Sequence, residues 1–442
     1  MSPSVFSNIA VALLVLGVII VIHELGHFLV AKLFKIKVET FSVGFGPRLF
    51  GFRRGETDYR ISALPLGGYV KMAGETPTDT ITGAPNEFMS KPKWQRFLVA
   101  AAGPLMNLVL AVGLMAGLYV YGTQVPEFMS GQARIGIVEA ASPADQAGIK
   151  SGDEIVSIDG QEQPNWQDVQ ALVLTSVGRP LPIVVNQSGQ RLNTTVTPIA
   201  KGSDDAGYVG MGPLYRIVVG GINANSPAIN AGLKVGDEII RVKDIDLRTS
   251  GKGLPEVIQT IPDETFPITI VRDGREMDLQ VTPIMQDGRR MIGIQIPPPM
   301  VMIKLGLVDA VGKSVQTNIE SATLIFQVLG RLFKREASMK QLDGPIGIIR
   351  VSGQALEQGV ATLLTLMALI SLNLGVLNIL PIPILDGGVM LLLVVESLMG
   401  RDLSLRMKER IVQVSFVFLL MLTVIVLYND VVKLLPPSQP AP

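Results

Sequence analysis

The sequence predicts a multi-span α-helical membrane protein with four transmembrane helices and two β-rich units outside the membrane. Three observations lead to this fold class. Of the 442 residues, 48% are hydrophobic and only 17% are charged, which is an apolar composition for a soluble protein. Long apolar runs lie near both ends of the chain. The region between them contains an internal repeat.

The first predicted span, residues 5–30, is almost continuously apolar and meets the length that a membrane-crossing helix requires. A cleaved signal peptide is the alternative, but no Lys or Arg precedes the run and no small-residue cleavage pattern closes it. Three further spans are expected at residues 97–121, at 361–395, where prolines interrupt the run, and at 411–428.

The distribution of basic residues predicts the orientation of these spans. Residues 32–96 carry eleven Lys and Arg, and residues 401–410 add four more, whereas none precedes the first span. Short cytoplasmic loops are rich in Lys and Arg. We therefore expect both termini and residues 127–360 to face outward, into the periplasm if the protein lies in the inner membrane of a Gram-negative cell.

Composition also excludes some partners and ligands. Lys plus Arg and Asp plus Glu number 38 each, and no basic stripe with interleaved aromatic residues occurs, so no nucleic-acid partner is indicated. The chain has no Cys, which excludes disulfides and thiolate metal sites. Any transition metal must therefore be bound by nitrogen and oxygen atoms.

The repeat pairs SPADQAGIKSGDEIVSIDG, which begins at Ser142, with SPAINAGLKVGDEIIRVKD, which begins 84 residues later at Ser226. Each copy is followed by a short glycine-containing strand, GYVGMGP from Gly207 and RMIGIQIPP from Arg290. Each unit is expected to contain one short helix before its Lys-x-Gly-Asp turn. The strands expected in the two units are residues 155–158 and 182–186, and residues 238–242 and 267–271.

The repeat units resemble PDZ domains. In that fold a peptide adds as an extra strand to a sheet edge, or a chain end is held by backbone N–H groups. The resemblance implies peptide binding at Gly207, Gly210, Ile292 and Gly293. The alternative is two spacer modules whose strands at 207–210 and 292–294 are closed by their own unit.

The first apolar run contains His23, Glu24, Leu25, Gly26 and His27, an H-E-x-x-H motif. This spacing places both imidazoles on one helix face, where they can ligate one Zn²⁺ while Glu24 acts as the general base. These are the only two histidines in the chain, which argues against two ordinary core histidines. A glutamate inside a spanning helix also needs a cavity or a partner, because its insertion costs about 2.5 kcal/mol or more.

A catalytic zinc generally has three protein ligands and one open position. Without a third His or a Cys, the third ligand must be a carboxylate, and the candidates near the predicted spans are Asp386, Glu396 and Asp430. Asp386 is the best placed, because two prolines and two glycines break the apolar run around it, and broken backbone at membrane depth is buried or lines a cavity. The alternative is that Asp386 only caps the restarting helix.

The H-E-L-G-H sequence and the later N-x-x-P-x-P-x-L-D-G sequence resemble the site-2 protease family of intramembrane zinc proteases, most closely its bacterial members with two PDZ units. The matching positions are His23, Glu24, His27 and Asp386 and, for the family's G-P-x-x-N motif, Gly103, Pro104 and Asn107. The resemblance implies one Zn²⁺ per chain. It also implies single-span membrane substrates that have lost their outer domain, notably an anti-sigma factor and remnant signal peptides.

The resemblance further implies that FSVGFGPRLF from Phe41 and ISALPLGGYVKM from Ile61 form a cytoplasmic, membrane-associated β-hairpin near the active site. An exposed edge of this hairpin could bind an unwound substrate segment by strand addition. A purely structural hairpin is the alternative. The candidate substrate-binding residues are Gly67, Gly68, Asn107, Asn378 and Pro381.

The predicted organisation has five parts. Residues 1–125 contain the first two spans and the hairpin, 126–213 and 214–300 the two PDZ units, 301–360 an outer linker, and 361–442 the last two spans. The linker includes an amphipathic helix at 311–336, lying along the outer membrane surface or packed as a structural helix.

The predicted function is zinc-dependent cleavage of single-span membrane proteins, with Glu24 as the base. Three alternatives remain at this point. The first is a non-catalytic PDZ-bearing receptor with a structural zinc. The others are a metal-ion transporter and a prenyl-protein type of zinc protease, whose third ligand would be a glutamate.

Overall fold

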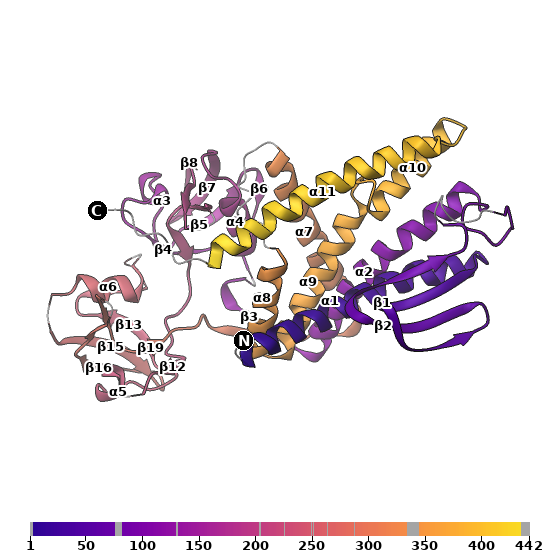
Figure 1. Ribbon diagram of the computed structural model, residues 1–442. Helices are drawn as coiled ribbons and strands as arrows, with labels where there is room; N and C mark the ends of the chain where they lie inside the picture. The colour runs from indigo at the N-terminus through magenta and orange to yellow at the C-terminus, as the bar shows by residue number, and fades with distance from the viewer. Residues whose placement is uncertain are drawn as a thin grey trace. The chain divides into compact units, whose positions relative to one another are not determined.

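The computed structural model describes residues 3–75, 82–129, 131–202, 205–224, 226–248, 250, 252–262, 264–286, 288–333 and 344–434. The chain divides into two compact units (Figure 1). The helical unit comprises Met1–Thr123, Lys304–Leu329 and Leu342–Pro442. The β-rich unit comprises Gln124–Ile303 and Gly330–Gln341.

The helical unit contains a long two-stranded hairpin and the longer helices of the chain. Its strands are β1 (Val38–Arg54) and β2 (Thr57–Met72). Its helices are α1 (Pro3–Leu33), α2 (Lys93–Tyr121), α7 (Leu307–Phe333), α8 (Pro345–Gln358), α9 (Val360–Ile379), α10 (Asp386–Leu398) and α11 (Leu405–Leu434), of which the end of α7 belongs to the other unit.

Four helices in the described part of the chain are long and apolar enough to cross a membrane, as the sequence predicted. Their candidate spans are Phe6–Leu33, Lys93–Tyr121, Val360–Ile379 and Arg406–Lys433. The predicted interruption of the third span is confirmed, because α9 ends at Ile379 and α10 begins at Asp386. Between them lie Pro381 and Pro383, which cannot donate a backbone hydrogen bond and disfavour helix.

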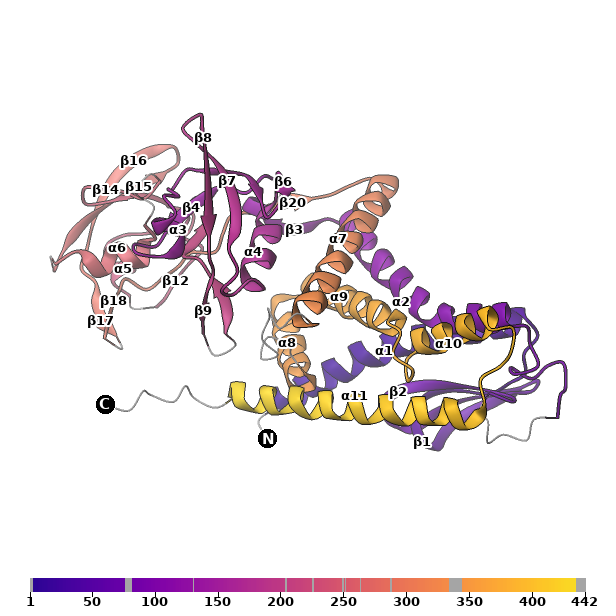
Figure 2. The same ribbon diagram turned by 90° about the horizontal axis from the view of Figure 1, so that it is seen from above.

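Helix α2 packs against α1, α9 and α10 (Figure 2). Two of these helix contacts, those of α1 and α9 with α2, are close because a glycine lies at each contact point. A Cβ atom at Gly26 of α1 would lie 2.3 Å from the Ala102 carbonyl oxygen, and one at Gly375 of α9 would lie 3.1 Å from the Pro104 carbonyl oxygen. The backbones of α1 and α9 therefore approach α2 at points where a larger residue would force them apart.

Two helices of the predicted linker differ from expectation. Helix α7 confirms the expected amphipathic helix but begins at Leu307, and residues 334–336 of the prediction lie outside the described residues. Helix α8 was not predicted, because its two internal glycines lower helix propensity. Tertiary contact explains one of them, since a Cβ at Gly353 would lie 2.2 Å from Cγ of Asn8 on α1.

The β-rich unit contains two similar halves. The first half contains β4 (Ile135–Val138), α3 (Pro143–Gln146), β5 (Glu154–Ile158), β6 (Gln161–Glu162), α4 (Trp166–Leu174), β7 (Leu181–Gln187), β8 (Gln190–Val196), β9 (Ile199–Lys201), β10 (Ala206–Tyr208) and β11 (Met211–Pro213). The second half contains β12 (Gly221–Ile222), α5 (Pro227–Asn230), β13 (Glu238–Val242), β14 (Ile245–Asp246), α6 (Leu254–Thr260), β15 (Phe266–Arg272), β16 (Arg275–Val281), β17 (Ile284–Gln286), β18 (Arg289–Met291) and β19 (Ile294–Gln295).

The sequence repeat corresponds to a structural repeat. One half has a four-stranded sheet of order β6-β5-β7-β8 and the other has the matching order β14-β13-β15-β16. Each half has its own hydrophobic core, one built from residues between Ala133 and Val209 and the other from residues between Val219 and Ile292. The strands and short helices expected in each copy are therefore present. Elements outside the repeat are β3 (Thr123–Pro126), the 3₁₀ turn Glu127–Met129 and β20 (Met300–Ile303), which pairs with β3.

Candidate metal centre and active site

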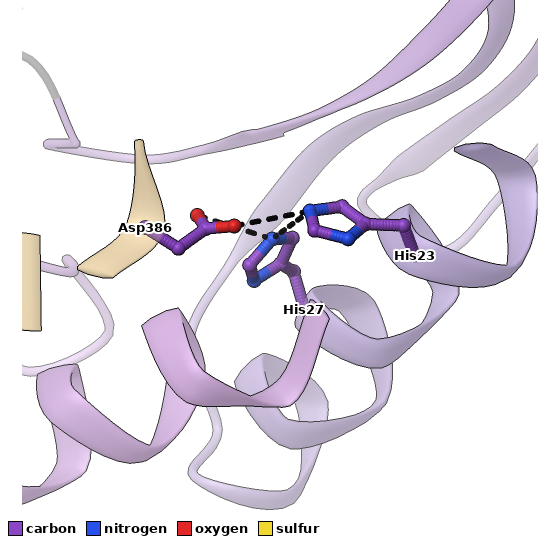
Figure 3. Close-up of side chains that lie close together, drawn as sticks. All are labelled: His23, His27 and Asp386. Carbon is purple, nitrogen blue, oxygen red and sulfur yellow. Dashed lines mark hydrogen bonds and ion pairs between the residues drawn. The ribbon is translucent and has the colours of Figure 1, made fainter. Parts of the chain in front are cut away.

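His23, His27 and Asp386 come together inside the helical unit (Figure 3). The two Nε2 atoms lie 3.2 Å apart, Asp386 Oδ2 lies 3.1 Å from His23 Nε2, and Asp386 Oδ1 lies 3.5 Å from His27 Nε2. In a tetrahedral zinc site with bonds of about 2.0–2.1 Å, neighbouring ligand atoms lie about 3.3 Å apart. The two nitrogens and the nearer carboxylate oxygens lie at about these distances, and one atom from each residue lies within 4.8 Å of the other two, so the three residues could hold one metal ion.

The break between α9 and α10 positions Asp386. A Cβ at Gly387 would lie 2.2 Å from the Ile379 carbonyl oxygen, and one at Gly388 would lie 2.2 Å from the Ile382 carbonyl oxygen. The connecting segment thus folds tightly onto the first turn of α10, and only glycine allows this contact. No side chain caps the start of α10, so the carboxylate of Asp386 points to the histidines instead.

The other two candidates for the third ligand, Glu396 and Asp430, form hydrogen bonds with other groups of the protein. Glu396 is 1% exposed, and its Oε1 accepts hydrogen bonds from Lys408 Nζ at 2.6 Å and from the Leu403 N–H at 2.9 Å. Asp430 accepts hydrogen bonds from backbone N–H groups at the start of α8, including that of Gly344 at 2.9 Å. Of the three candidates, only Asp386 lies beside the histidines.

The other ring nitrogen of each histidine contacts α2. His27 Nδ1 donates to the Val99 carbonyl oxygen at 2.8 Å, which leaves the Nε2 lone pair of a neutral ring available to a metal. His23 Nδ1 lies 3.2 Å from the side-chain amide of Asn107. Between these two contacts α2 presents Gly103, which the sequence motif contained but whose role it did not reveal.

Glu24 lies beside this cluster and is bound by the hairpin. Its Oε2 accepts a hydrogen bond from the Val70 N–H of β2 at 3.0 Å, and its Cγ lies 3.7 Å from where a Cβ of Gly68 would be. The predicted approach of the hairpin to the H-E-x-x-H helix is therefore confirmed. Val70 itself was missed, because its contact uses only the backbone N–H, which every residue except proline has.

A cavity of about 510 Å³ opens onto the cluster. Its walls include His23, Glu24, His27 and Asp386 together with Tyr69, Val70, Pro383 and Arg96. None of the five candidate substrate-binding residues lines this cavity, although Tyr69 directly follows Gly68 and Pro383 follows Pro381 by two positions.

The five candidates have different surroundings. Gly67 and Gly68 are buried in the hairpin, where Cβ atoms would lie 2.9 Å from the Phe45 ring and 2.7 Å from the Ser42 carbonyl oxygen. Asn378 is half-buried near the end of α9, and Pro381 is exposed in the following break. Asn107 is completely buried on α2.

The residues predicted to bind peptides in the repeat units make contacts within their own half. The Gly210 carbonyl accepts from the Glu139 N–H at 2.7 Å, and the Gly293 carbonyl accepts from the Asn223 N–H at 2.9 Å. The Ile292 carbonyl accepts from the Ala228 N–H at 3.0 Å, and Gly207 pairs with Ala200 of β9. Peptide binding at these positions stays a prediction.

Comparison with known proteins places this chain in a family. The sequence profile of peptidase family M50 matches residues 11–422. The chain is 31% identical to the regulator of sigma E protease of Haemophilus influenzae, over 96% of this chain and 98% of that protein. It is 30% identical to the regulator of sigma-E protease RseP of Escherichia coli K12, with coverages of 97% and 99%.

Two further similar proteins support different conclusions, because one matches nearly the whole chain and the other matches only a small part of it. A putative zinc metalloprotease of Treponema pallidum is 29% identical, over 96% of this chain and 98% of that protein. A solved PDZ domain of the SdrC-like protein from Listeria innocua matches 19% of this chain and 92% of its own length at 19% identity, but its TM-score of 0.17 is too low to support a fold assignment. From the family match over most of its length, the chain belongs to peptidase family M50, the site-2 protease family of membrane zinc metalloproteases.

Proposed function

We propose that this protein is an intramembrane endopeptidase that cleaves single-span membrane proteins, with one Zn²⁺ per chain held by His23, His27 and Asp386. The observation that carries the proposal is the spacing of the three ligand atoms, which all lie within 4.8 Å of one another, with Glu24 next to them. A zinc ion there would polarise the scissile carbonyl and make a water molecule more acidic.

Glu24 is the general base in this proposal. It takes the proton of the attacking water and passes it to the leaving amine. The hydrogen bond from the Val70 N–H holds one carboxylate oxygen, so the side chain is oriented before substrate arrives. The other oxygen is then available for proton transfer.

The proposed substrate is an unwound segment of a membrane-spanning helix, because a helix hides its peptide bonds in its own hydrogen bonds. Tyr69 and Val70 of β2 line the cavity, and among the described strands β2 pairs only with β1. The edge of β2 that does not pair with β1 is a place for strand addition, beside Val70, whose N–H binds Glu24. Gly67, Gly68, Asn378 and Pro381, which border this region in sequence, are proposed to shape substrate binding.

The relatives named regulators of sigma-E protease point to the finer assignment. We propose an anti-sigma factor and remnant signal peptides as substrates, and an inner-membrane location. The charge distribution supports periplasmic termini and repeat units, with the active site near the cytoplasmic leaflet. The repeat units, as PDZ domains, would exclude bulky intact proteins or bind new chain ends.

The test uses the full-length protein with a model single-span substrate and compares wild type, Glu24→Gln, His23→Ala and Glu409→Gln. Glu409 is exposed on α11 and serves as the matched control. We expect Glu24→Gln to retain zinc without cleaving, His23→Ala to lose both zinc and cleavage, and Glu409→Gln to behave as wild type. Cleavage by Glu24→Gln would refute the mechanism. Zinc binding without cleavage by wild type would favour the receptor with a structural zinc.

A further inference from the structure

Asn107 has an unusual environment for a polar side chain on a membrane helix. It is 0% exposed, and its backbone carbonyl accepts a hydrogen bond at 2.8 Å from the hydroxyl of Ser371, which is also fully buried on α9. The side chain has no access to the cavity described above. Its one described side-chain hydrogen bond is the contact of Nδ2 with His23 Nδ1 at 3.2 Å.

The amide of Asn107 is only half satisfied in this arrangement. Its Oδ1 is buried and has no hydrogen-bond partner. Because Nδ2 can only donate, His23 Nδ1 must accept, and the proton of the neutral ring then sits on Nε2. Nε2 lies 3.1 Å from Asp386 Oδ2, a distance at which it donates to that carboxylate. In this tautomer His23 cannot ligate a metal through Nε2.

A half-turn of the amide about its Cβ–Cγ bond exchanges its oxygen and nitrogen. Oδ1 then accepts from a protonated Nδ1, and the Nε2 lone pair is free for a metal. Metal-binding histidines generally donate their other ring N–H to an oxygen acceptor, which fixes the tautomer and the ring orientation. His27 already has this arrangement, because the Val99 carbonyl can only accept. The two histidines thus differ in how their tautomers are set.

We infer that Asn107 is a positioning residue for His23. Its side-chain oxygen accepts the His23 Nδ1–H, which leaves the Nε2 lone pair free for zinc. The asparagine amide can do this because a half-turn exchanges its donor for its acceptor. This inference rests on the proposed zinc site, and it replaces the expected contact of Asn107 with substrate.

The variants that test the positioning role of Asn107 each change one property of its hydrogen bonding. Asn107→Asp keeps the size and offers only acceptors when ionised, so it favours the ligating tautomer. Asn107→Leu keeps the approximate size and offers neither donor nor acceptor. Ser371→Ala removes the hydrogen bond to the Asn107 backbone but leaves the amide next to His23, so it serves as the control for helix bridging.

The first measurement is zinc affinity of the purified full-length protein, by competition with a chromogenic chelator. Loss of the hydrogen-bond partner of a metal-binding histidine typically lowers metal affinity about 10–100-fold. We expect Asn107→Leu to lose zinc affinity by this factor. Asn107→Asp should bind zinc at least as tightly as wild type, and Ser371→Ala should bind it about as tightly as wild type. Equal affinity of Asn107→Leu and wild type, or equal losses in Asn107→Leu and Asn107→Asp, would overturn the inference.

The second measurement needs no variant. The chain has only two histidines, so protein labelled with ¹⁵N-histidine and purified without a histidine tag gives ring signals from His23 and His27 alone. We expect both rings to carry the proton on Nδ1 when zinc is bound. A His23 ring with its proton on Nε2 in the zinc-bound protein would contradict the inference. Failure of wild type to bind zinc would instead refute the proposed function.

Discussion

A Cβ atom at Gly103 would lie 2.3 Å from Nε2 of His27. The same atom would lie 2.7 Å from Nε2 of His23, so α2 faces the two ligand nitrogens with bare backbone. No side chain, not even a methyl group, fits at this position without moving an imidazole. The glycine is therefore part of the proposed metal centre although it offers no ligand.

We expect Gly103→Ala to lose most zinc binding and proteolysis, because the methyl group displaces the imidazoles from ligating geometry. The control is Gly113→Ala on the same helix, where nothing lies within 4 Å of an added Cβ. That control should be neutral or slightly stabilising, since Ala is favoured over Gly in a helix by about 1 kcal/mol. Zinc content and cleavage of a model substrate check the pair. Normal zinc binding by Gly103→Ala would show that the site accommodates the methyl group.

The assignment of Asp386 as third ligand predicts different effects for substitutions at half-buried Asp386 and at buried Asp430. Asp386→Asn should lose zinc affinity with little change in the packing of α11. Asp430→Asn should retain zinc but loosen α11, because hydrogen bonds from the N–H groups of α8 to a charged carboxylate contribute about 1.5–3 kcal/mol. Metal analysis and thermal unfolding of the two purified variants measure the difference. Zinc loss in Asp430→Asn alone would reverse the assignment.

The ion pair of Glu396 and Lys408 predicts a strong single-substitution effect. The carboxylate is 1% exposed and lies 2.6 Å from Lys408 Nζ. Removing one partner of a buried pair costs about 3–5 kcal/mol, whereas replacing both by apolar residues is often neutral. We expect Lys408→Met to lower the melting temperature markedly, and Glu396→Leu combined with Lys408→Met to recover most of the loss. A double variant less stable than Lys408→Met would count against this account.

The two repeats hold equivalent aspartates with different partners. In the second half, Asp237 is 1% exposed and bonds Arg272 Nε and Nη2, each at 2.7 Å. In the first half, Asp153 bonds the neutral Gln187 Nε2 at 3.0 Å. Burial alone would raise the pKa of Asp237, but the hydrogen bonds and charge of Arg272, together with the Lys234 N–H, hold this pKa below its ordinary value.

A folded-state pKa below the unfolded value means that the ionised carboxylate stabilises the fold. This contribution is fully present above the unfolded pKa, near 4, and is lost as the pH falls through the folded-state pKa. We expect Arg272→Gln to lower protection of β13 and β15 against hydrogen exchange at neutral pH. It should also weaken the acid dependence of that protection. The control, Lys252→Gln, removes a charge in the same half without a described ion pair and should leave both unchanged. An unaltered acid dependence in Arg272→Gln would exclude Arg272 as the cause.

In the repeat units, local sequence patterns were enough to predict the positions of the main strands. Their strands β5, β7, β13 and β15 agree with the sequence prediction to within about one residue at each end, because alternation and turn residues act over short distances. Helix α8 was missed, since a contact with α1 and the hydrogen bonds to Asp430 compensate for its glycines. Neither contact is visible from neighbours in the chain.

The sequence alone determined the pairing of His23 with His27, because helix geometry places residues four apart on one face wherever the helix packs. It also determined the break before Asp386, because proline cannot continue a helix. The sequence favoured Asp386 over Glu396 and Asp430 as the proposed third ligand, but only the tertiary structure showed that groups from α11 and α8 bind the other two carboxylates. The tertiary structure likewise placed Asn107 and Gly103 behind the histidines, because a contact between α1 and α2 joins residues about 80 positions apart whose spacing has no local signal.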